Sequence, residues 1–189
     1  MYNGKTAINR MKLEHNKLTK RVIKWSVQAL IITAIFIAIS AFLARNMLST
    51  QQQVPSFINQ TNVKLISGNQ LSLANLKDWS ESPQHLIYFF APWCTICAFS
   101  QPSLEAFGMA KPNVQIMMVA LDWENEEQVT NFKAKHQFDF PVLLGNQTLK
   151  QQWQVDAYPS YYFVNAQGRV TSKDRGLVTL PGLIARSMY

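Results

Sequence analysis

Both cysteines of this 189-residue chain lie in one short motif, Trp93-Cys94-Thr95-Ile96-Cys97, whose setting constrains the fold more than any other feature. The apolar run at residues 86–90 before it is typical of a buried strand, and residues 98–110 after it can form a helix. Cys94 is therefore expected at a strand-to-helix turn, where unpaired backbone N–H groups and the helix dipole stabilise a thiolate. Cys97 lies one helical turn further on, close enough to attack a mixed disulfide on Cys94. The pattern predicts Cys94 as the nucleophile and Cys97 as the resolving thiol.

Two other roles of the cysteine pair stay open at this point. As a structural staple, a loop of about four residues yields only roughly 1.9 kcal/mol, against about 3 kcal/mol for a loop of about fifteen. As a metal site, two thiolates can hold Cu(I), but tetrahedral zinc needs about two more ligands. The three histidines, His15, His85 and His136, are far from the pair in sequence and are interpreted as tail, loop and helix-surface residues. We therefore predict no metal site and no cofactor.

Basic residues gather at the N-terminus, ahead of a long uncharged run. Seven basic residues and one acidic residue precede residue 25, whereas the chain from residue 46 onward contains ten of each sign. The neutral C-terminal part argues against nucleic-acid binding. Residues 25–44 carry no charge, and as a helix they span about 30 Å, which is the thickness of a bilayer core. We predict a transmembrane helix here.

The positive-inside rule gives this helix a direction. Because the basic cluster precedes the apolar run, the N-terminus is expected in the cytoplasm and the C-terminal domain outside. A cleaved signal peptide is the alternative, but its apolar region is usually about 7 to 15 residues long. An uncleaved anchor is the favoured reading.

Four segments follow along the chain: a basic cytoplasmic tail at 1–24, the transmembrane helix at 25–44, a linker at 45–62 and a folded domain at 63–189. The linker is polar and without periodicity, so it is expected to be a flexible tether that reaches on the order of 20 to 25 Å. In the domain, strand and helix patterns alternate, which predicts an α/β sheet. The expected strands are 63–66, 71–73, 86–90, 114–121, 140–144, 161–164 and 169–171, and the expected helices are 98–110, 125–137 and 181–188.

Taken together, these residues resemble the thioredoxin-like fold. They are most similar to the membrane-anchored TlpA, ResA and DsbE group, and within it to the suppressor-of-copper-sensitivity D type. The resemblance covers about residues 63–188 and rests on Trp93-Cys94-x-x-Cys97 after an apolar strand, on Pro102, and on Tyr158-Pro159 before a second apolar strand. It implies a central mixed sheet flanked by helices, an N-terminal β-hairpin and a central insertion at about residues 125–153.

The resemblance also implies a substrate groove. Pro159 is then a cis proline, and Trp93, Tyr158 and Pro159 shape the groove beside the cysteines. The structural alternative for Pro159 is an ordinary trans proline at the edge of a strand.

Three positions depart from the family pattern. Tyr88 occupies the position of a buried aspartate in cytosolic thioredoxins, and Ser100 replaces a glutamate of some tethered reductases. No proton acceptor for Cys97 is therefore assigned. Ser160 stands where cytochrome c maturation reductases tend to have glutamate, which argues against that specialised role.

The sequence thus predicts a protein disulfide oxidoreductase with a single-pass anchor in the bacterial inner membrane and a periplasmic catalytic domain. Its expected partners are cysteine-containing envelope proteins and a membrane redox partner, and an extracytoplasmic setting permits stable disulfides. The dipeptide between the cysteines does not determine whether the enzyme oxidises or reduces. The alternative from a different class is an envelope copper-binding module for copper tolerance that uses the same two thiolates.

Overall fold

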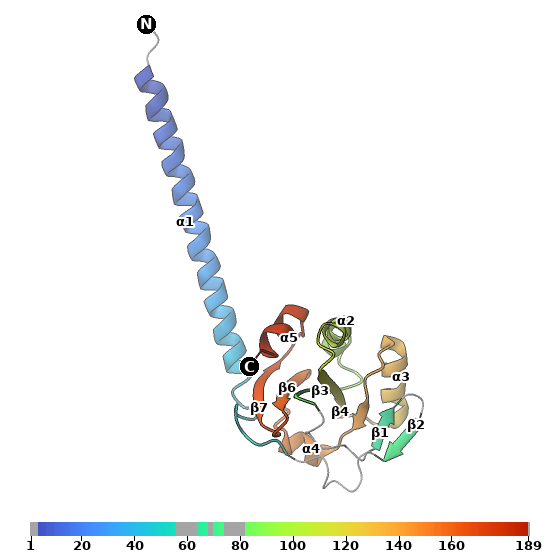
Figure 1. Cartoon of the computed structure of the whole chain (residues 1–189). Helices are drawn as coiled ribbons and strands as arrows, with labels where there is room; N and C mark the ends of the chain where they lie inside the picture. The colour runs from blue at the N-terminus through green and yellow to red at the C-terminus, as the bar shows by residue number, and fades with distance from the viewer. Residues whose placement is uncertain (1–3, 56–63, 68–69, 74–81, 189) are drawn as a thin grey trace. The chain divides into compact units, whose positions relative to one another are not determined.

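The computed structural model describes residues 4–55, 64–67, 70–73 and 82–188 (Figure 1). The chain divides into two units, an N-terminal one that ends at Phe42 and an α/β domain that begins at Leu43. Helix α1 (Gly4–Leu43) accounts for the first unit. The described elements of the domain are β1 (Lys64–Ser67), β2 (Gln70–Leu73), β3 (Gln84–Phe90), α2 (Thr95–Ala110), β4 (Val114–Ala120), α3 (Glu126–His136), β5 (Val142–Leu144), α4 (Gln147–Gln152), β6 (Ser160–Asn165), β7 (Val170–Arg175) and α5 (Leu180–Arg186).

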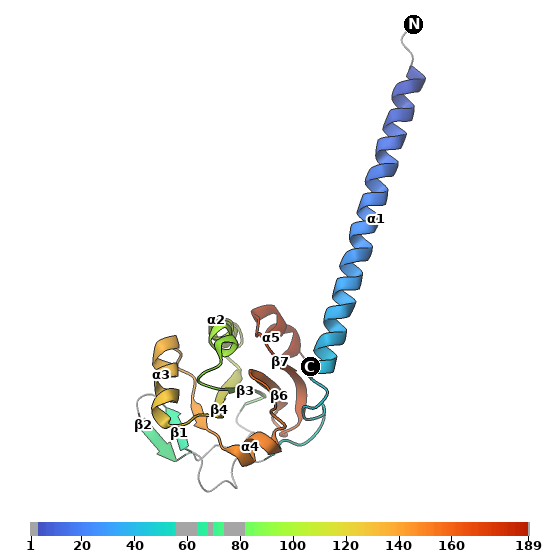
Figure 2. The ribbon, with the colours of Figure 1, turned by 180° about the vertical axis from the view of Figure 1, so that it is seen from behind.

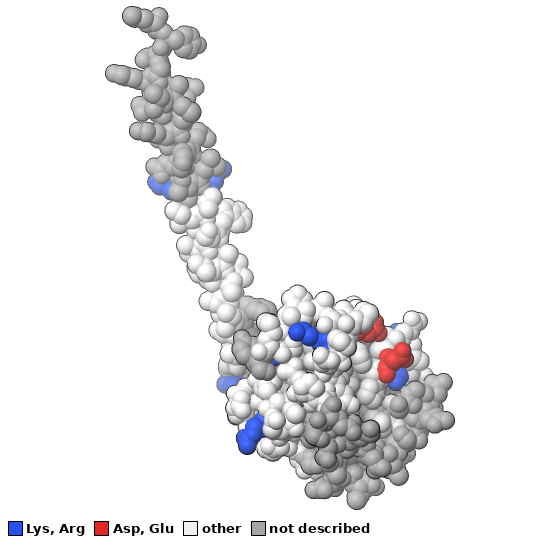
Figure 3. Space-filling model, viewed as in Figure 1, with Lys and Arg blue, Asp and Glu red and all other residues white. Residues whose placement is uncertain are grey.

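Helix α1 contains the run that was predicted to cross a membrane. By length and composition, its segment Lys20–Ile39 is able to span a bilayer, and none of that segment is buried. A signal sequence near an N-terminus meets the same criterion. In Figure 3 the described atoms that follow the blue basic side chains of this helix are white, whereas blue and red groups are scattered over the visible face of the domain. The single apolar helix is present, and its insertion in a membrane stays a prediction.

A mixed sheet forms the centre of the domain, with the order β2-β1-β5-β4-β3-β6-β7 among the described strands. Strands β3, β4 and β5 are parallel, and β1, β6 and β7 pair antiparallel with their neighbours. Strand β3 is buried on both faces, which explains its unbroken apolar run. The predicted α/β fold is confirmed, including the β1–β2 hairpin, whose turn residues 68–69 lie outside the described residues.

Each face of the sheet has its own apolar layer. Leu86, Tyr88 and Phe90 of β3 pack with residues of α2, α3 and α5, whereas Ile87 and Phe89 pack on the opposite face with residues of α4. Both ribbon views show α2 and α5 side by side on one face and α4 on the other (Figures 1 and 2). The loops at the carboxyl end of β3 therefore begin from a rigid, fully covered strand.

Residues 47–54, which we call the strap, also cover the face opposite α2. Met47, Leu48 and Val54 are buried against the sheet. The Gln51 N–H donates to the Val170 carbonyl within β7 at 2.7 Å, and the Val54 N–H donates to the Gly168 carbonyl just before β7 at 2.8 Å. The predicted flexible tether is therefore wrong for residues 47–54, while residues 56–62 of that linker lie outside the described part. The error arose because three apolar residues in a polar stretch show no periodicity, although they suffice to fill a gap on a sheet.

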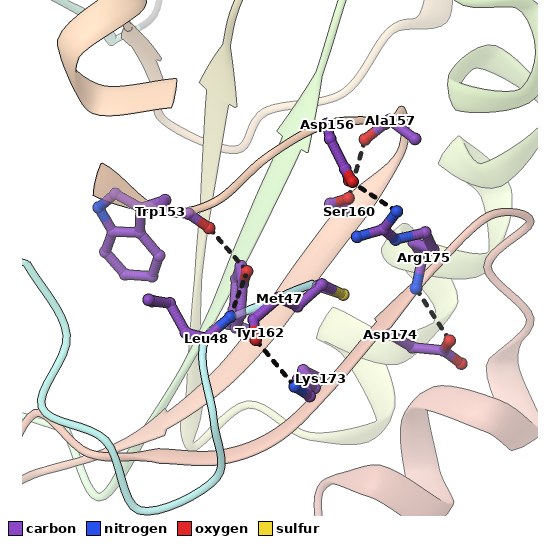
Figure 4. Close-up of polar contacts among 10 residues, drawn as sticks. All are labelled: Met47, Leu48, Trp153, Asp156, Ala157, Ser160, Tyr162, Lys173, Asp174 and Arg175. Carbon is purple, nitrogen blue, oxygen red and sulfur yellow. Dashed lines mark hydrogen bonds and ion pairs between the residues drawn. The ribbon is translucent and has the colours of Figure 1, made fainter. Parts of the chain in front are cut away.

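Polar contacts fasten the strap to strands that are distant in sequence (Figure 4). The Leu48 N–H donates to the Tyr162 hydroxyl at 3.3 Å, and that hydroxyl donates to the Trp153 carbonyl at 2.7 Å. The Lys173 ammonium donates to the Met47 carbonyl at 3.0 Å. Burial raises the pKa of Tyr162, so its phenol stays protonated and keeps its role as a donor. The domain thus extends almost to the end of α1.

Candidate active site

The cysteine pair lies where β3 meets α2, as the sequence predicts. Cys94 is the N-cap of α2, with an extended backbone, and its sulfur accepts a hydrogen bond from the Cys97 N–H at 3.1 Å. This cap starts the helix at Thr95, three positions earlier than expected from the apolar pattern. A negative charge on the Cys94 sulfur would face the same N–H group and the positive end of the helix, which favour a thiolate.

The two cysteines form a disulfide, with a Cα–Cα distance of 5.2 Å. They differ in access, because Cys94 is 7% exposed and Cys97 is fully buried. An external thiol can therefore approach only the Cys94 sulfur. This difference in access agrees with the predicted order of attack, and the roles of Cys94 as nucleophile and Cys97 as resolving thiol stay predictions.

The segment before β6 contains the second predicted part of the site. The Tyr158–Pro159 peptide bond is cis, as the resemblance implies. Pro159 is buried, and its carbonyl accepts from the Gly176 N–H at 2.8 Å. Just upstream, Asp156 pairs with Arg175 of β7 at 2.6 Å, as Figure 4 shows. Two contacts from beyond β6 therefore hold this loop.

Trp93 and Tyr158 come together although they lie on different loops. Their rings meet edge to face, with centroids 5.8 Å apart. Trp93 is 66% exposed, which is unusual for an indole and suits a surface that meets a partner. The structure therefore joins two of the three residues predicted to bind substrate, and the binding roles of Trp93, Tyr158 and Pro159 stay predictions.

Asp122 is the residue that the sequence analysis missed. It follows β4, and its main-chain carbonyl accepts from the indole Nε1 of Trp93 at 3.0 Å. Its carboxylate accepts from the Tyr158 hydroxyl at 2.9 Å and from the Lys150 ammonium at 2.5 Å. A usable signal existed in the sequence, since a polar residue directly after a buried parallel strand lies at the edge where α/β folds place their sites.

A groove opens between the cysteine turn and α3. Its volume is about 700 Å³, and Trp93 and Cys94 contribute to one wall. The other wall presents one face of α3 and the residue Glu124 before it. The α3 residues in the lining are Gln128, Asn131, Phe132, Lys135 and His136. Polar side chains of this second wall therefore border a groove whose surface is mostly apolar and which reaches Cys94.

The interior around Cys97 is mostly apolar, with a few hydroxyl groups and the buried Gln101 amide, which donates to the Cys97 carbonyl at 3.3 Å. Tyr88 is fully buried, and burial raises the pKa of its phenol, so it stays neutral. Among the described residues, the Tyr88 hydroxyl has no hydrogen-bond partner within normal geometry. Ser100 is satisfied, because it donates to the Ile96 carbonyl and accepts from the Val178 N–H. Neutral groups thus occupy both positions at which the resemblance led us to look for a carboxylate.

One histidine differs from its predicted place. His85 lies in β3 and is buried, rather than in a loop, while His136 is in the last turn of α3 and borders the groove. Among the described residues, no group of three or more His, Cys, Asp or Glu side chains is placed to hold a metal ion.

Comparison with known proteins gives matches over the α/β domain. The sequence profile of the AhpC/TSA family matches residues 50–173, a range that begins in the strap. A thioredoxin-like protein of Haemophilus influenzae is 26% identical over 137 residues, which cover 72% of this chain and 78% of that protein. The sporulation thiol-disulfide oxidoreductase A of Bacillus subtilis is 23% identical over 122 residues, which cover 62% of this chain and 71% of that protein.

A solved structure supports the same fold. StoA from Bacillus subtilis is 18% identical and superposes with a TM-score of 0.54, over 70% of this chain and 99% of that one. At this identity the likeness concerns the fold alone, which is the thioredoxin-like α/β arrangement.

Proposed function

We propose that this chain, which belongs to the AhpC/TSA family, is an envelope thiol–disulfide oxidoreductase that acts on protein cysteines through Cys94 and Cys97. The enzyme class agrees with the thiol–disulfide oxidoreductases among its relatives and structural neighbours. One observation carries the assignment to these residues: the only described disulfide has one sulfur at a helix N-cap and its other sulfur fully buried. That arrangement fits a pair that opens and closes in exchange with a partner.

In the reducing direction, the Cys94 thiolate attacks a sulfur of the substrate disulfide. A bond forms between Cys94 and that sulfur, and the other substrate sulfur leaves as a thiolate that takes up a proton. Cys97 then loses its proton and attacks the Cys94 sulfur. This step closes the Cys94–Cys97 disulfide and releases the second substrate thiol, so that two electrons pass to the substrate. The same steps in reverse oxidise a substrate dithiol.

Burial supports this order of events. Because Cys97 is enclosed by apolar groups, a charged sulfur there is disfavoured until the mixed disulfide has formed next to it. Cys94, by contrast, has a hydrogen-bond donor and a helix terminus that favour its thiolate. The two thiols of the reduced enzyme are therefore expected to react at very different rates with an external disulfide.

Helix α1 is proposed as the membrane anchor, with the N-terminus in the cytoplasm and the domain in the periplasm. Support comes from the length and apolar composition of Lys20–Ile39 and from the basic residues before it. The proposed domain starts near Leu43 instead of residue 63, because the strap packs on the sheet. The catalytic unit would then follow the anchor with little free chain between them.

Trapping of mixed disulfides tests the function. The variant Cys97→Ser in the full-length, membrane-bound chain should accumulate adducts with cysteine-containing envelope proteins, because the resolving thiol is absent. The matched variant Cys94→Ser should trap none, and a reductant should release the adducts of Cys97→Ser. Adduct yields that are equal in the two variants, or absent from both, would contradict the mechanism.

Copper binding by the same thiolates is the alternative that the sequence leaves open. It predicts that the reduced full-length chain binds one Cu(I) tightly and shows little exchange with protein disulfides. A Cu(I) titration of the reduced chain, performed beside the trapping experiment, separates the two functions.

A further inference from the structure

Asp122 lies at the meeting point of three loops around the cysteine pair. It follows β4, Trp93 precedes Cys94, and Tyr158 precedes the cis proline. The φ angle of Asp122 is 48°, in the left-handed region that non-glycine residues seldom adopt. In this conformation two groups of Asp122 have different partners. The main-chain carbonyl contacts Trp93, and the carboxylate contacts Tyr158 and Lys150.

The contacts hold an exposed ring in one place. A surface indole that is 66% exposed would ordinarily change rotamer freely. Here the indole Nε1 donates to the Asp122 carbonyl, and the indole and the Tyr158 ring meet edge to face. The Tyr158 hydroxyl in turn donates to the Asp122 carboxylate. Trp93 also lines the groove that contains Cys94. The Trp93 ring is therefore a part of the groove wall that contacts with Asp122 and Tyr158 hold in place.

Lys150 of α4 is the third member of the group that holds Trp93. We call Asp122, Tyr158 and Lys150 the brace. Its ammonium pairs with the Asp122 carboxylate and lies 5.6 Å from the centroid of the Tyr158 ring. The side chains of Lys150 and Asp122 are 23% and 33% exposed, so solvent screens this pair only in part. Burial and the nearby carboxylate both raise the pKa of Tyr158, so the phenol remains a hydrogen-bond donor at any physiological pH.

We propose that Asp122 is a positioning residue for the exchange reaction: it fixes Trp93 as a preorganised wall of the groove beside Cys94 and thereby sets the affinity for protein substrates. The inference rests on the proposed function and deepens it, because it separates the binding of a polypeptide from the chemistry at sulfur. A small disulfide needs only access to Cys94. A polypeptide that carries a disulfide must also lie along the groove, where a mobile indole would have to be ordered at each encounter.

Two variants at Asp122 test this point while they respect its backbone. The variant Asp122→Gly accepts a φ of 48° without strain and removes the carboxylate. The variant Asp122→Asn also tolerates this conformation and keeps an oxygen acceptor for Tyr158, but it removes the charge. As a matched control, Asp139→Asn makes the same chemical change at an exposed aspartate outside the groove lining.

The assay mixes reduced full-length enzyme with insulin, as the protein disulfide, and with the small disulfide DTNB. For Asp122→Gly we expect the insulin concentration at half-maximal rate to rise about tenfold, with a maximal rate within about twofold of wild type, because hydrogen bonds to a charged group are lost. The ratio of the insulin rate to the DTNB rate should fall accordingly. Asp122→Asn should show a smaller rise, and Asp139→Asn should match the wild type.

A spectroscopic readout reports the brace without any turnover. The indole N–H resonance of Trp93, assigned through its loss in Trp93→Phe, should shift and exchange faster with solvent in Asp122→Gly. The variant Tyr158→Phe, which deletes a single hydroxyl, is a second route to the same change with the backbone intact. Both readouts apply to the folded enzyme, whose cooperative unfolding is checked first.

The outcomes separate the inference from the function on which it rests. Equal slowing of the insulin and DTNB reactions in Asp122→Gly, or no change in either, would overturn the role of Asp122 while wild-type exchange stands. An unchanged Trp93 resonance in both Asp122→Gly and Tyr158→Phe would overturn it as well. A wild-type enzyme that exchanges with neither disulfide would overturn the proposed function, and the inference with it.

Discussion

The Tyr162 hydroxyl is the joint between the strap and the sheet, so its removal is a direct test of the strap. In Tyr162→Phe, the Trp153 carbonyl loses a donor at 2.7 Å and the Leu48 N–H loses an acceptor at 3.3 Å, and all three groups belong to buried residues. Two hydrogen bonds at about 1 kcal/mol each, together with the cost of the buried Leu48 N–H that loses its acceptor, give a loss of about 2 to 3 kcal/mol in the free energy of unfolding. For a domain of this size the expected fall in Tm is about 4 to 12 °C.

Tyr161→Phe is the matched control, one residue away on the same strand. Its hydroxyl is 3.4 Å from a carboxylate oxygen of Asp174, which Arg186 also engages, so no group is left unpaired. The expected loss is less than about 1 kcal/mol. Thermal unfolding of both full-length variants in the same detergent measures the difference.

Hydrogen exchange shows whether the loss arises at the strap. The amide protons of Gln51 and Val54 donate to carbonyls within and just before β7, respectively, and they should exchange faster in Tyr162→Phe only. Equal destabilisation by the two substitutions, or unchanged exchange at Gln51 and Val54, would refute the reasoning that this hydroxyl fastens the strap.

Three further predictions concern stability and pH. Asp156→Asn should lower the free energy of unfolding by about 1 to 3 kcal/mol, because it leaves the nearly buried Arg175 without its carboxylate. The loss should be smaller at high salt, and denaturant titrations at two salt concentrations measure it. Gly145→Ala should cost about 1 to 3 kcal/mol, since a Cβ there meets the Leu121 side chain just after β4 at 2.6 Å and the Ala120 carbonyl at 3.1 Å. In Gly108→Ala the Cβ meets only side-chain atoms, at 3.3 Å or more, so Tm should change much less. Burial lowers the pKa of His136 below 6.5, so as the pH falls the unfolded chain takes up the proton before the folded one does. Stability should therefore fall as the pH drops through about 6.5. His136→Gln should remove that part of the pH dependence of Tm, and an unaltered profile of Tm against pH would contradict this explanation.

Local patterns in the sequence were sufficient for the strand, the turn and the helix around the cysteines. The apolar run of β3, the N-cap position of Cys94 and the hairpin turn with Gly168 at a φ of 71° depend on neighbours within a few residues. The short strand β5 was predicted two residues too long at its start, and helix α4 was not predicted, because six residues without an apolar period give little signal.

Some residues of the candidate site could be identified from the sequence, and others only from the structure. Cys94 and Cys97 could be identified from their spacing, and the pairing of Trp93 with Tyr158 was foreshadowed only by resemblance to a family. Asp122 could not be given its role, since its partners Trp93 and Tyr158 are 29 and 36 positions away along the chain.

Sequence patterns were enough to predict most of the strands and helices, the turn that contains both cysteines, and an apolar helix before the domain. That the strap belongs to the domain became evident from long-range contacts such as the one between Leu48 and Tyr162, which spans 114 positions. The physical reason is that backbone preference and apolar period act over a few residues. A polar residue such as Asp122, or a short segment such as the strap, acquires its partners only when the sheet order brings distant loops to one edge.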